Sequence, residues 1–203
     1  YTQAIVLKPN YTKAHSNLGN TLQELGRLEE AEASYKQAIV LQPDYAEPHF
    51  NLGNTLQELG RLEEAETSYI QAIALKSDYT EAHLNLALIK RFEAKDEQYL
   101  KMLKLYPDTK MSEEERCHIN FGLAKAYEDL EDFEKAFAHY NEGNTIRKKI
   151  LNYDFNQDEE LFRQIKCNYS QIVQRSLKLD NLSRDITPIF IVGMPRSGTT
   201  LVE

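Results

Sequence analysis

The sequence NLGNTLQELGRLEEAE at residues 17–32 decides the fold, because it recurs unchanged at residues 51–66. The two copies lie 34 residues apart, and the residues around them keep the same period. The positions that recur in register are Tyr1, Tyr35 and Tyr69, Ala4, Ala38 and Ala72, and Leu7, Leu41 and Leu75. Self-similarity at a fixed period of this length indicates a chain built from stacked copies of one supersecondary unit.

Each unit contains two stretches with helical spacing of small and large apolar residues. In residues 12–45 these are Leu18, Gly19 and Leu22 in the first stretch, and Ala31, Tyr35 and Ala38 in the second. Small residues let two helices approach closely, while leucine and tyrosine fill the space between them. The period and these residues resemble the tetratricopeptide repeat. That resemblance implies an all-α, right-handed superhelix of helix–turn–helix units that binds a protein or an extended peptide in its concave groove.

The register of the repeat divides the chain into segments. We expect the end of a truncated repeat at 1–11, complete repeats at 12–45 and 46–79, a degenerate repeat at 80–111, a repeat-like helix pair at 112–147, and linker helices at 148–187. One linker helix should run from about 157 to 175, where apolar residues recur with helical spacing. A single helix cannot bury its apolar stripe alone, so we also expect at least one helix before residue 1.

Local signals predict where individual helices begin and end. Gly26 and Gly60 lie where the first helix of a unit must stop, in the position that favours a left-handed backbone. Pro43 is expected to end the second helix. Ser112 and Glu115 have the spacing of a capping box at a helix start.

Composition excludes several classes of function. The net charge is −8, and no basic stretch with interleaved aromatic residues is present, so we expect no nucleic-acid partner. No apolar run approaches the length of a membrane span, and no signal peptide is visible, so we expect no membrane partner. Cys117 and Cys167 are isolated, as is typical of reduced thiols, and this favours a cytoplasmic location.

Asparagine recurs on the first helix of successive units. Asn17, Asn51 and Asn85 share one repeat position, and Asn20 and Asn54 share another. Each side-chain amide offers a donor and an acceptor, so a ladder of them is predicted to hold an extended peptide by its main chain. The ladder resembles the superhelical repeats of the O-linked N-acetylglucosamine transferases, which use asparagines in this manner. Asparagine is also common at these positions in repeats without such a role.

Histidine recurs with the same period but does not predict a metal site. His15, His49 and His83 lie 34 residues apart, where the repeat usually carries an aromatic residue. Equivalent positions in successive units are separated by about 10 Å or more, which is too far for one metal ion. We therefore expect these rings to contribute to packing.

The C-terminal stretch PIFIVGMPRSGTTLVE, residues 188–203, has a different character. A β-branched apolar run ends at Gly193, and Gly198-Thr199-Thr200 reads as the start of a helix. A strand, a glycine-bounded loop and a helix start form an anion site, because the first N–H groups of a helix have no helical partner. A nucleoside-triphosphate loop would carry lysine where Thr199 stands, and the only cation here is Arg196.

The residues Gly193-Met-Pro-Arg-Ser-Gly-Thr-Thr200 resemble the 5′-phosphosulfate loop of sulfotransferases that use 3′-phosphoadenosine 5′-phosphosulfate. The resemblance implies the first strand–loop–helix of an α/β, P-loop-like sulfotransferase domain, as in proteins that fuse tetratricopeptide repeats to such a domain. Arg196 would neutralise the phosphosulfate and stabilise charge in the transition state. The other donor-binding positions would be Gly193, Pro195, Ser197, Gly198, Thr199 and Thr200.

Together these features predict the repeat region of a sulfotransferase that transfers a sulfuryl group to an acceptor hydroxyl or amine. The general base and the 3′-phosphate site would lie beyond Glu203, so the 203 residues alone are expected to have no turnover. Two alternatives stay open at this point. One is a non-catalytic scaffold for protein–protein interaction, and the other is the repeat region of a glycosyltransferase.

Overall fold

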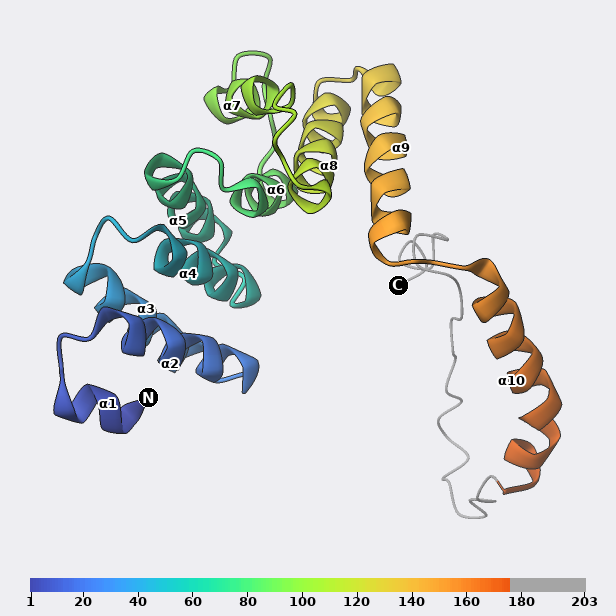
Figure 1. The fold of residues 1–203 in the computed structure, drawn as a ribbon, viewed down its shortest axis with the longest axis horizontal. Coiled ribbons are helices and arrows are strands. Elements are labelled where there is room, and N and C mark those ends of the chain that lie inside the picture. Colours follow the sequence, from blue (N-terminus) through green and yellow to red (C-terminus); the bar gives the residue numbers. More distant parts are fainter. Residues whose placement is uncertain (176–203) are drawn as a thin grey trace, which may run out of the picture. The chain divides into compact units, whose positions relative to one another are not determined.

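The structure is a computed structural model that describes residues 1–175 and, in α10, side chains as far as residue 169. All regular secondary structure in this part of the chain is helical (Figure 1). The helices are α1 (Thr2–Leu7), α2 (Thr12–Glu24), α3 (Leu28–Leu41), α4 (Ala46–Glu58), α5 (Leu62–Leu75), α6 (Thr80–Ile89), α7 (Glu97–Leu105), α8 (Glu113–Asp129), α9 (Phe133–Ile150) and α10 (Phe155–Arg175). Residues 1–153 form one compact unit, and α10 belongs to a second unit that begins at Asp154.

The pairs α2/α3 and α4/α5 are helical hairpins that stack on each other, with α3 packed against α4 and α2 in contact with α4 (Figure 1). Their turns contain Gly26 and Gly60, with φ angles of 71° and 75°. No atom lies within 4 Å of a Cβ built at either glycine, so the backbone conformation alone favours glycine there. The prediction of left-handed glycine caps is confirmed.

A glycine and a tyrosine set the distance between the helices of each regular hairpin. A Cβ atom at Gly19 would lie 2.6 Å from Cε1 of Tyr35, and a Cβ atom at Gly53 would lie 2.6 Å from Cε1 of Tyr69. Both tyrosines are fully buried. The first helix therefore approaches the ring so closely that a side chain at the glycine position would collide with it.

The regular pattern stops after α6. The chain leaves α6 through Lys90, which pairs with Asp96 at 2.9 Å and with Glu66 at 3.3 Å. The next helix, α7, is short, and α6 packs mainly against α8. A Cβ atom at Gly122 of α8 would lie 2.7 Å from Sδ of Met102 in α7 and 3.8 Å from Cβ of Ala87 in α6. The absence of a side chain at Gly122 thus lets α8 approach α6 and α7 together.

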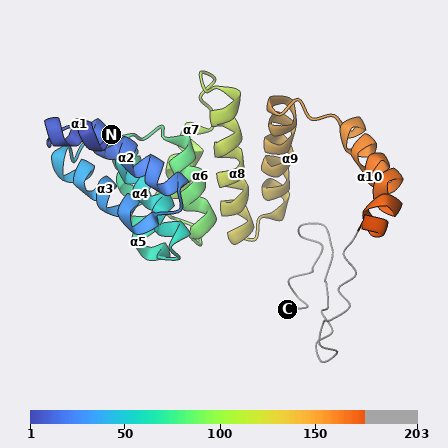
Figure 2. The ribbon, with the colours of Figure 1, turned by 90° about the horizontal axis from the view of Figure 1, so that it is seen from below.

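The helices α8 and α9 form the last hairpin of the first unit and lie side by side in both views (Figure 2). The predicted capping box is confirmed, because the side chains of Ser112 and Glu115 each bind the other's backbone N–H. Asp132 caps α9 through the N–H of Lys135, at 3.2 Å. Together these caps satisfy N–H groups that have no partner inside their helices.

The helix α10, in the second unit, covers the linker helix predicted from about 157 to 175. Its apolar side chains are exposed at Phe155, Leu161, Phe162, Ile165 and Tyr169. Among residues 1–175, no helix combines the length and apolar character that a membrane span requires.

Candidate functional site

The asparagines predicted from the sequence form a hydrogen-bonded network across the stack. The Oδ1 atom of Asn20 accepts from the hydroxyl of Tyr35 at 2.7 Å and from Nδ2 of Asn51, in the next repeat, at 2.9 Å. One repeat further on, Oδ1 of Asn54 accepts from the hydroxyl of Tyr69 at 2.8 Å and from Nδ2 of Asn85 at 2.9 Å. Each repeat is thus tied to the next through one amide oxygen that serves two donors.

The network divides the five asparagines by role. The amide oxygens of Asn20 and Asn54 are occupied by donors from the protein itself. No hydrogen bond within residues 1–175 occupies the amide oxygens of Asn51 and Asn85, which are half-buried. The side chain of Asn17 takes no part in this network and lines neither of the two hollows described below. Asn51 and Asn85 are therefore the asparagines best placed to bind a ligand.

Two shallow hollows lie along these asparagines on the first helices of the repeats. Each has a volume of about 360 Å³, and the two share Gln23 and Glu58. Nε2 of Gln23 donates to Oε1 of Glu58 at 2.6 Å and so joins α2 to α4. We call this surface the asparagine groove, formed by Asn20, Gln23, Glu24, Asn51, Asn54, Gln57, Glu58 and Asn85.

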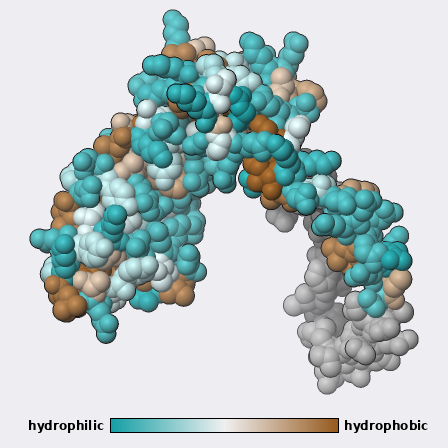
Figure 3. Space-filling view, in the orientation of Figure 1, coloured by the Kyte–Doolittle hydropathy of each residue, from teal (hydrophilic) through white to brown (hydrophobic). Residues whose placement is uncertain are grey.

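The residues Gln23, Gln57, Glu24 and Glu58 of the groove were missed by the sequence analysis. The signal was present, since they lie three and four residues after Asn20 and Asn54 and recur with the same period. On a helix that spacing places side chains on one face. Hydrophilic side chains predominate over the part of the surface that belongs to α1–α5 (Figure 3).

The buried tyrosines of the network keep their protons. Burial raises the pKa of Tyr35 above its ordinary value, and the carboxylates of Glu47, Glu58 and Glu24 raise it further. A phenol with a raised pKa stays a neutral donor at neutral pH. The hydroxyl therefore remains available to hold the amide oxygen of Asn20.

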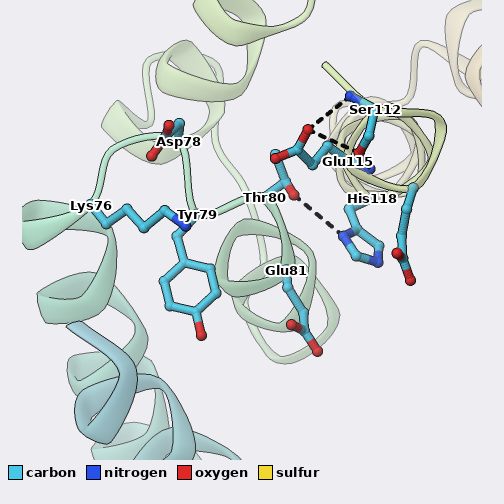
Figure 4. A pocket seen from close by; sticks show the side chains of 9 residues that line it. Lys76, Asp78, Tyr79, Thr80, Glu81, Ser112, Glu115 and His118 are labelled. Atoms are coloured by element: carbon cyan, nitrogen blue, oxygen red, sulfur yellow. Dashed lines mark hydrogen bonds between the residues drawn. The ribbon is translucent and has the colours of Figure 1, made fainter. Parts of the chain in front are cut away.

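A separate pocket of about 350 Å³ lies where the connection between α5 and α6 meets the start of α8 (Figure 4). The hydroxyl of Thr80 and Nδ1 of His118 are 3.3 Å apart across this junction. Nζ of Lys76 lies 4.9 Å from the centre of the Tyr79 ring. The capping box at Ser112 and Glu115 also lines the pocket. Of these contacts, the one between Thr80 and His118 joins the two sides of the junction.

The recurring histidines link each first helix to the turn before it. The Nε2 atom lies 2.9 Å from the Pro9 carbonyl in His15, 3.1 Å from the Pro43 carbonyl in His49, and 3.0 Å from the Ser77 carbonyl in His83. A carbonyl only accepts, so Nε2 is the protonated nitrogen in each ring. This contact gives the histidines a structural role. No cluster of His, Cys, Asp or Glu in the described residues could hold a metal ion.

The predicted phosphosulfate loop, with Arg196 and the residues from Gly193 to Thr200, lies outside the described residues. The same holds for the predicted strand–loop–helix at 188–203. The described part of the site is thus the asparagine groove.

Stacked helical hairpins with a polar groove along their first helices define an α-helical repeat protein. The chain belongs to the tetratricopeptide repeat family. Models of this family match residues 20–60 and 53–90 ("TPR repeat") and residues 1–33 and 118–150 ("Tetratricopeptide repeat"). These matches together cover more than half of the chain. The predicted tetratricopeptide solenoid is confirmed, and proteins of this kind bind protein partners.

Several known proteins resemble this chain. A MamA crystal structure matches with a TM-score of 0.57 and 22% identity, over 75% of this chain and 88% of that one. PilF of Pseudomonas aeruginosa matches with a TM-score of 0.55 and 21% identity, over 68% and 61% respectively. Both share the fold. An uncharacterized protein of Aquifex aeolicus (strain VF5) is 33% identical over 113 residues, and the match spans 55% of this chain and 15% of that protein.

Proposed function

We propose that this chain is a protein-binding module whose asparagine groove holds an extended segment of a partner by its main chain. The observation that supports this most directly is the recurrence of half-buried amides along the groove at Asn51 and Asn85. Asn51 donates from Nδ2 to Asn20, and Asn85 donates from Nδ2 to Asn54. These hydrogen bonds fix the orientation of both amides. An amide fixed in this way loses little rotamer freedom on binding, which favours affinity.

The chemistry of the groove suits a main chain better than a particular side chain. A peptide unit has one N–H donor and one C=O acceptor, and a carboxamide supplies the complement of both. An extended segment advances about 3.3–3.6 Å per residue, so one repeat step of about 10 Å corresponds to about three residues. Asn51 and Asn85 would therefore contact main-chain groups about three residues apart.

Selection from a random dodecapeptide library on the immobilised chain tests this proposal. The enriched peptide, resynthesised with a fluorophore, should bind the wild type and lose roughly tenfold or more in affinity for the double variant Asn51→Ala/Asn85→Ala, because two pairs of hydrogen bonds are removed. A matched control is Asn10→Ala/Asn144→Ala, which changes two exposed asparagines that line neither hollow. Peptides that bind both double variants as tightly as the wild type would refute the proposal.

A second readout keeps the test decisive if the double variant is poorly folded. In the wild-type chain the side-chain amide NMR signals of Asn51 and Asn85 should shift when the selected peptide is added. The amide signals of Asn10 and Asn144 should stay unchanged. Unchanged signals at Asn51 and Asn85 would place the peptide elsewhere.

We further propose that the parent protein is a sulfotransferase that uses 3′-phosphoadenosine 5′-phosphosulfate, with the groove delivering the acceptor protein. The support is the sequence of residues 193–200, with Arg196 as the only cation of the loop. Arginine suits this position because its planar fork matches a tetrahedral oxyanion at two points. The match covers only 15% of the Aquifex relative, so that relative is several times longer than the matched segment. A parent protein with further domains would be similar to it in this respect.

The donor is tested on the full-length protein. The melting temperature should rise with 3′-phosphoadenosine 5′-phosphate and not with ATP at the same concentration, and the substitution Arg196→Ala should abolish the rise. Equal stabilisation by ATP, or none by the bisphosphate, would contradict the proposal.

A further inference from the structure

Most carboxylates of the second helices α3 and α5 are paired with a cation, with Glu29 and Glu63 as the exceptions among the described residues. On α3 and α5, Glu30 and Glu64 pair with Arg27 and Arg61, each at 2.6 Å. Also on α3, Glu32 pairs with Lys36 at 2.7 Å. On the first helices, Glu24 and Glu58, which line the groove, and Glu47 and Glu81, in the first turns of α4 and α6, take part in no ion pair within residues 1–175. The negative charge along the groove is thus uncompensated by the protein itself.

These carboxylates without a cationic partner act on the tyrosines of the asparagine network. Burial raises the pKa of Tyr69 above its ordinary value, the side chain of Asn85 opposes this shift, and the charges of Glu58 and Glu81 add to it. Burial and then Glu81 and Glu47 raise the pKa of Tyr79 in the same direction. The carboxylates of Glu58 and Glu81 thus act on Tyr69, and Glu58 and Glu24 act on Tyr35.

No lysine or arginine lines either hollow of the asparagine groove. The groove therefore offers a partner two kinds of group, which are neutral amides and carboxylates without a cation beside them. The amides suit a main chain of any sequence. Carboxylates exposed to solvent favour cationic side chains and repel anionic ones. The charge of the groove therefore selects among the extended segments that its amides would otherwise accept alike.

We infer that the asparagine groove binds an extended segment rich in lysine or arginine, donated by a protein partner. The inference rests on the proposed function and specifies the partner's chemistry. Glu24 and Glu58 are one repeat apart, so a step of about 10 Å between them matches about three residues of extended chain. The partner segment should carry its cationic residues at about that spacing, with the main chain on Asn51 and Asn85.

Three fluorescent dodecapeptides test this inference, each with four Xaa-Ser-Gln units in which Xaa is Lys, Gln or Glu. At low ionic strength the lysine peptide should bind most tightly, the glutamine peptide about tenfold more weakly, and the glutamate peptide most weakly. The double variant Glu24→Gln/Glu58→Gln keeps the shape of the groove, and the carboxamide introduced by Glu58→Gln retains an oxygen that can accept from Gln23. This variant should reduce the affinity for the lysine peptide about tenfold and bring it to that of the glutamine peptide.

The control is Glu29→Gln/Glu63→Gln, which removes the same charge from the first turns of α3 and α5, outside both hollows. It should leave the affinity for the lysine peptide within about twofold, because these charges lie outside the hollows and water weakens their interaction with a peptide bound there. An equal loss in both double variants would overturn the inference and indicate attraction by net charge alone. Equal affinity of the lysine and glutamine peptides for the wild type would also overturn it, while leaving the proposed main-chain binding intact. Failure of the library selection, in contrast, would count against the proposed function itself.

Discussion

The hairpins α4/α5 and α8/α9 each bring a glycine close to an aromatic ring, but at different positions of the hairpin. In α4/α5 the glycine is on the first helix and the ring of Tyr69 comes from the second. In α8/α9 the glycine is Gly143 on the second helix, and a Cβ there would lie 3.2 Å from Cε1 of Phe121 on the first. In the register that the turn hydrogen bonds define, Gly143 and Phe121 correspond to Ala72 and Phe50 of α4/α5, so a small residue faces a ring at two different levels of the hairpin.

The turns of the two hairpins have the same backbone geometry but carry different residues. Gly60 and Glu131 occupy equivalent positions before the second helix, with φ angles of 75° and 61°. Asp132 then caps α9 with its side chain, whereas Arg61 at the start of α5 makes no such bond. The backbone path of the turn is thus common to both hairpins, and α9 combines a less favourable residue at the turn with a better cap.

The largest expected effect separates the two glycine–aromatic contacts. Gly53→Ala places a Cβ 2.6 Å from the fully buried ring of Tyr69, so we expect a loss of about 2 kcal/mol in the free energy of unfolding. Gly143→Ala meets the half-buried Phe121 at 3.2 Å, and a small shift of that ring relieves the contact. The helix propensity of alanine offsets the rest, so the change should stay within about 1 kcal/mol. Urea denaturation followed by circular dichroism measures both.

The substitution Gly19→Ala should lower the free energy of unfolding as much as Gly53→Ala does, because Gly19 makes the same contact with Tyr35. Equal stability losses at Gly53 and Gly143, or none at Gly53, would mean that the distance from the added Cβ to the ring does not decide the cost of the substitution.

A smaller effect is expected at the turns. Gly60→Ala should lower the free energy of unfolding by about 1 kcal/mol, because alanine is strained at positive φ and no neighbour compensates. Glu131→Gly should raise the melting temperature, by an amount reduced through the extra entropy of glycine in the unfolded chain. Thermal melts of the two variants measure the contrast. A stabilising Gly60→Ala or a destabilising Glu131→Gly would reverse it.

The smallest expected effect depends on pH and distinguishes His83 from the equivalent histidines. Burial lowers the pKa of His83, the hydrogen bond to the Ser77 carbonyl opposes this shift in part, and the charge of Lys101 adds to it. Its Nδ1 is buried without a hydrogen-bond partner in the described structure, so protonation would add a buried donor with no acceptor. The unfolded chain binds the proton more tightly, hence stability present above about pH 6.5 should fall as the pH drops below that value.

Melting temperatures between pH 7.5 and 5 test this effect, with His83→Gln as the comparison. The variant should show a weaker dependence on pH over this range than the wild type. Identical pH profiles would show that His83 does not contribute to the change.

Most of the regular solenoid could be predicted from the sequence, because its residues recur where the same contacts recur. The left-handed backbone at Gly26 and Gly60 and the capping box at Ser112 follow from the short-range geometry of the chain. The close contact between Gly143 and Phe121 could not be predicted, because Gly143 stands where α3 and α5 carry Ala38 and Ala72. The packing of α6 on α8 likewise depends on contacts between distant residues.

The groove was predictable only in part. The positions of the asparagines follow from the period, and the structure adds that Asn20 and Asn54 are occupied by the tyrosine hydroxyls and by the next repeat. Which amide oxygens stay open is decided by hydrogen bonds between residues 15 or 31 positions apart. No local pattern specifies those partners.

The bridge from Asn51 to Asn20 has a consequence for how such a protein evolves. The same bridge joins Asn85 to Asn54, with the same separation of 31 residues. The two junctions between regular repeats are therefore joined by the same contact, so the regular repeats can follow one another in any order. Duplication or deletion of a 34-residue segment of the gene would join compatible surfaces without any further mutation. The length of the groove, and with it the number of partner residues it spans, could change in a single genetic event.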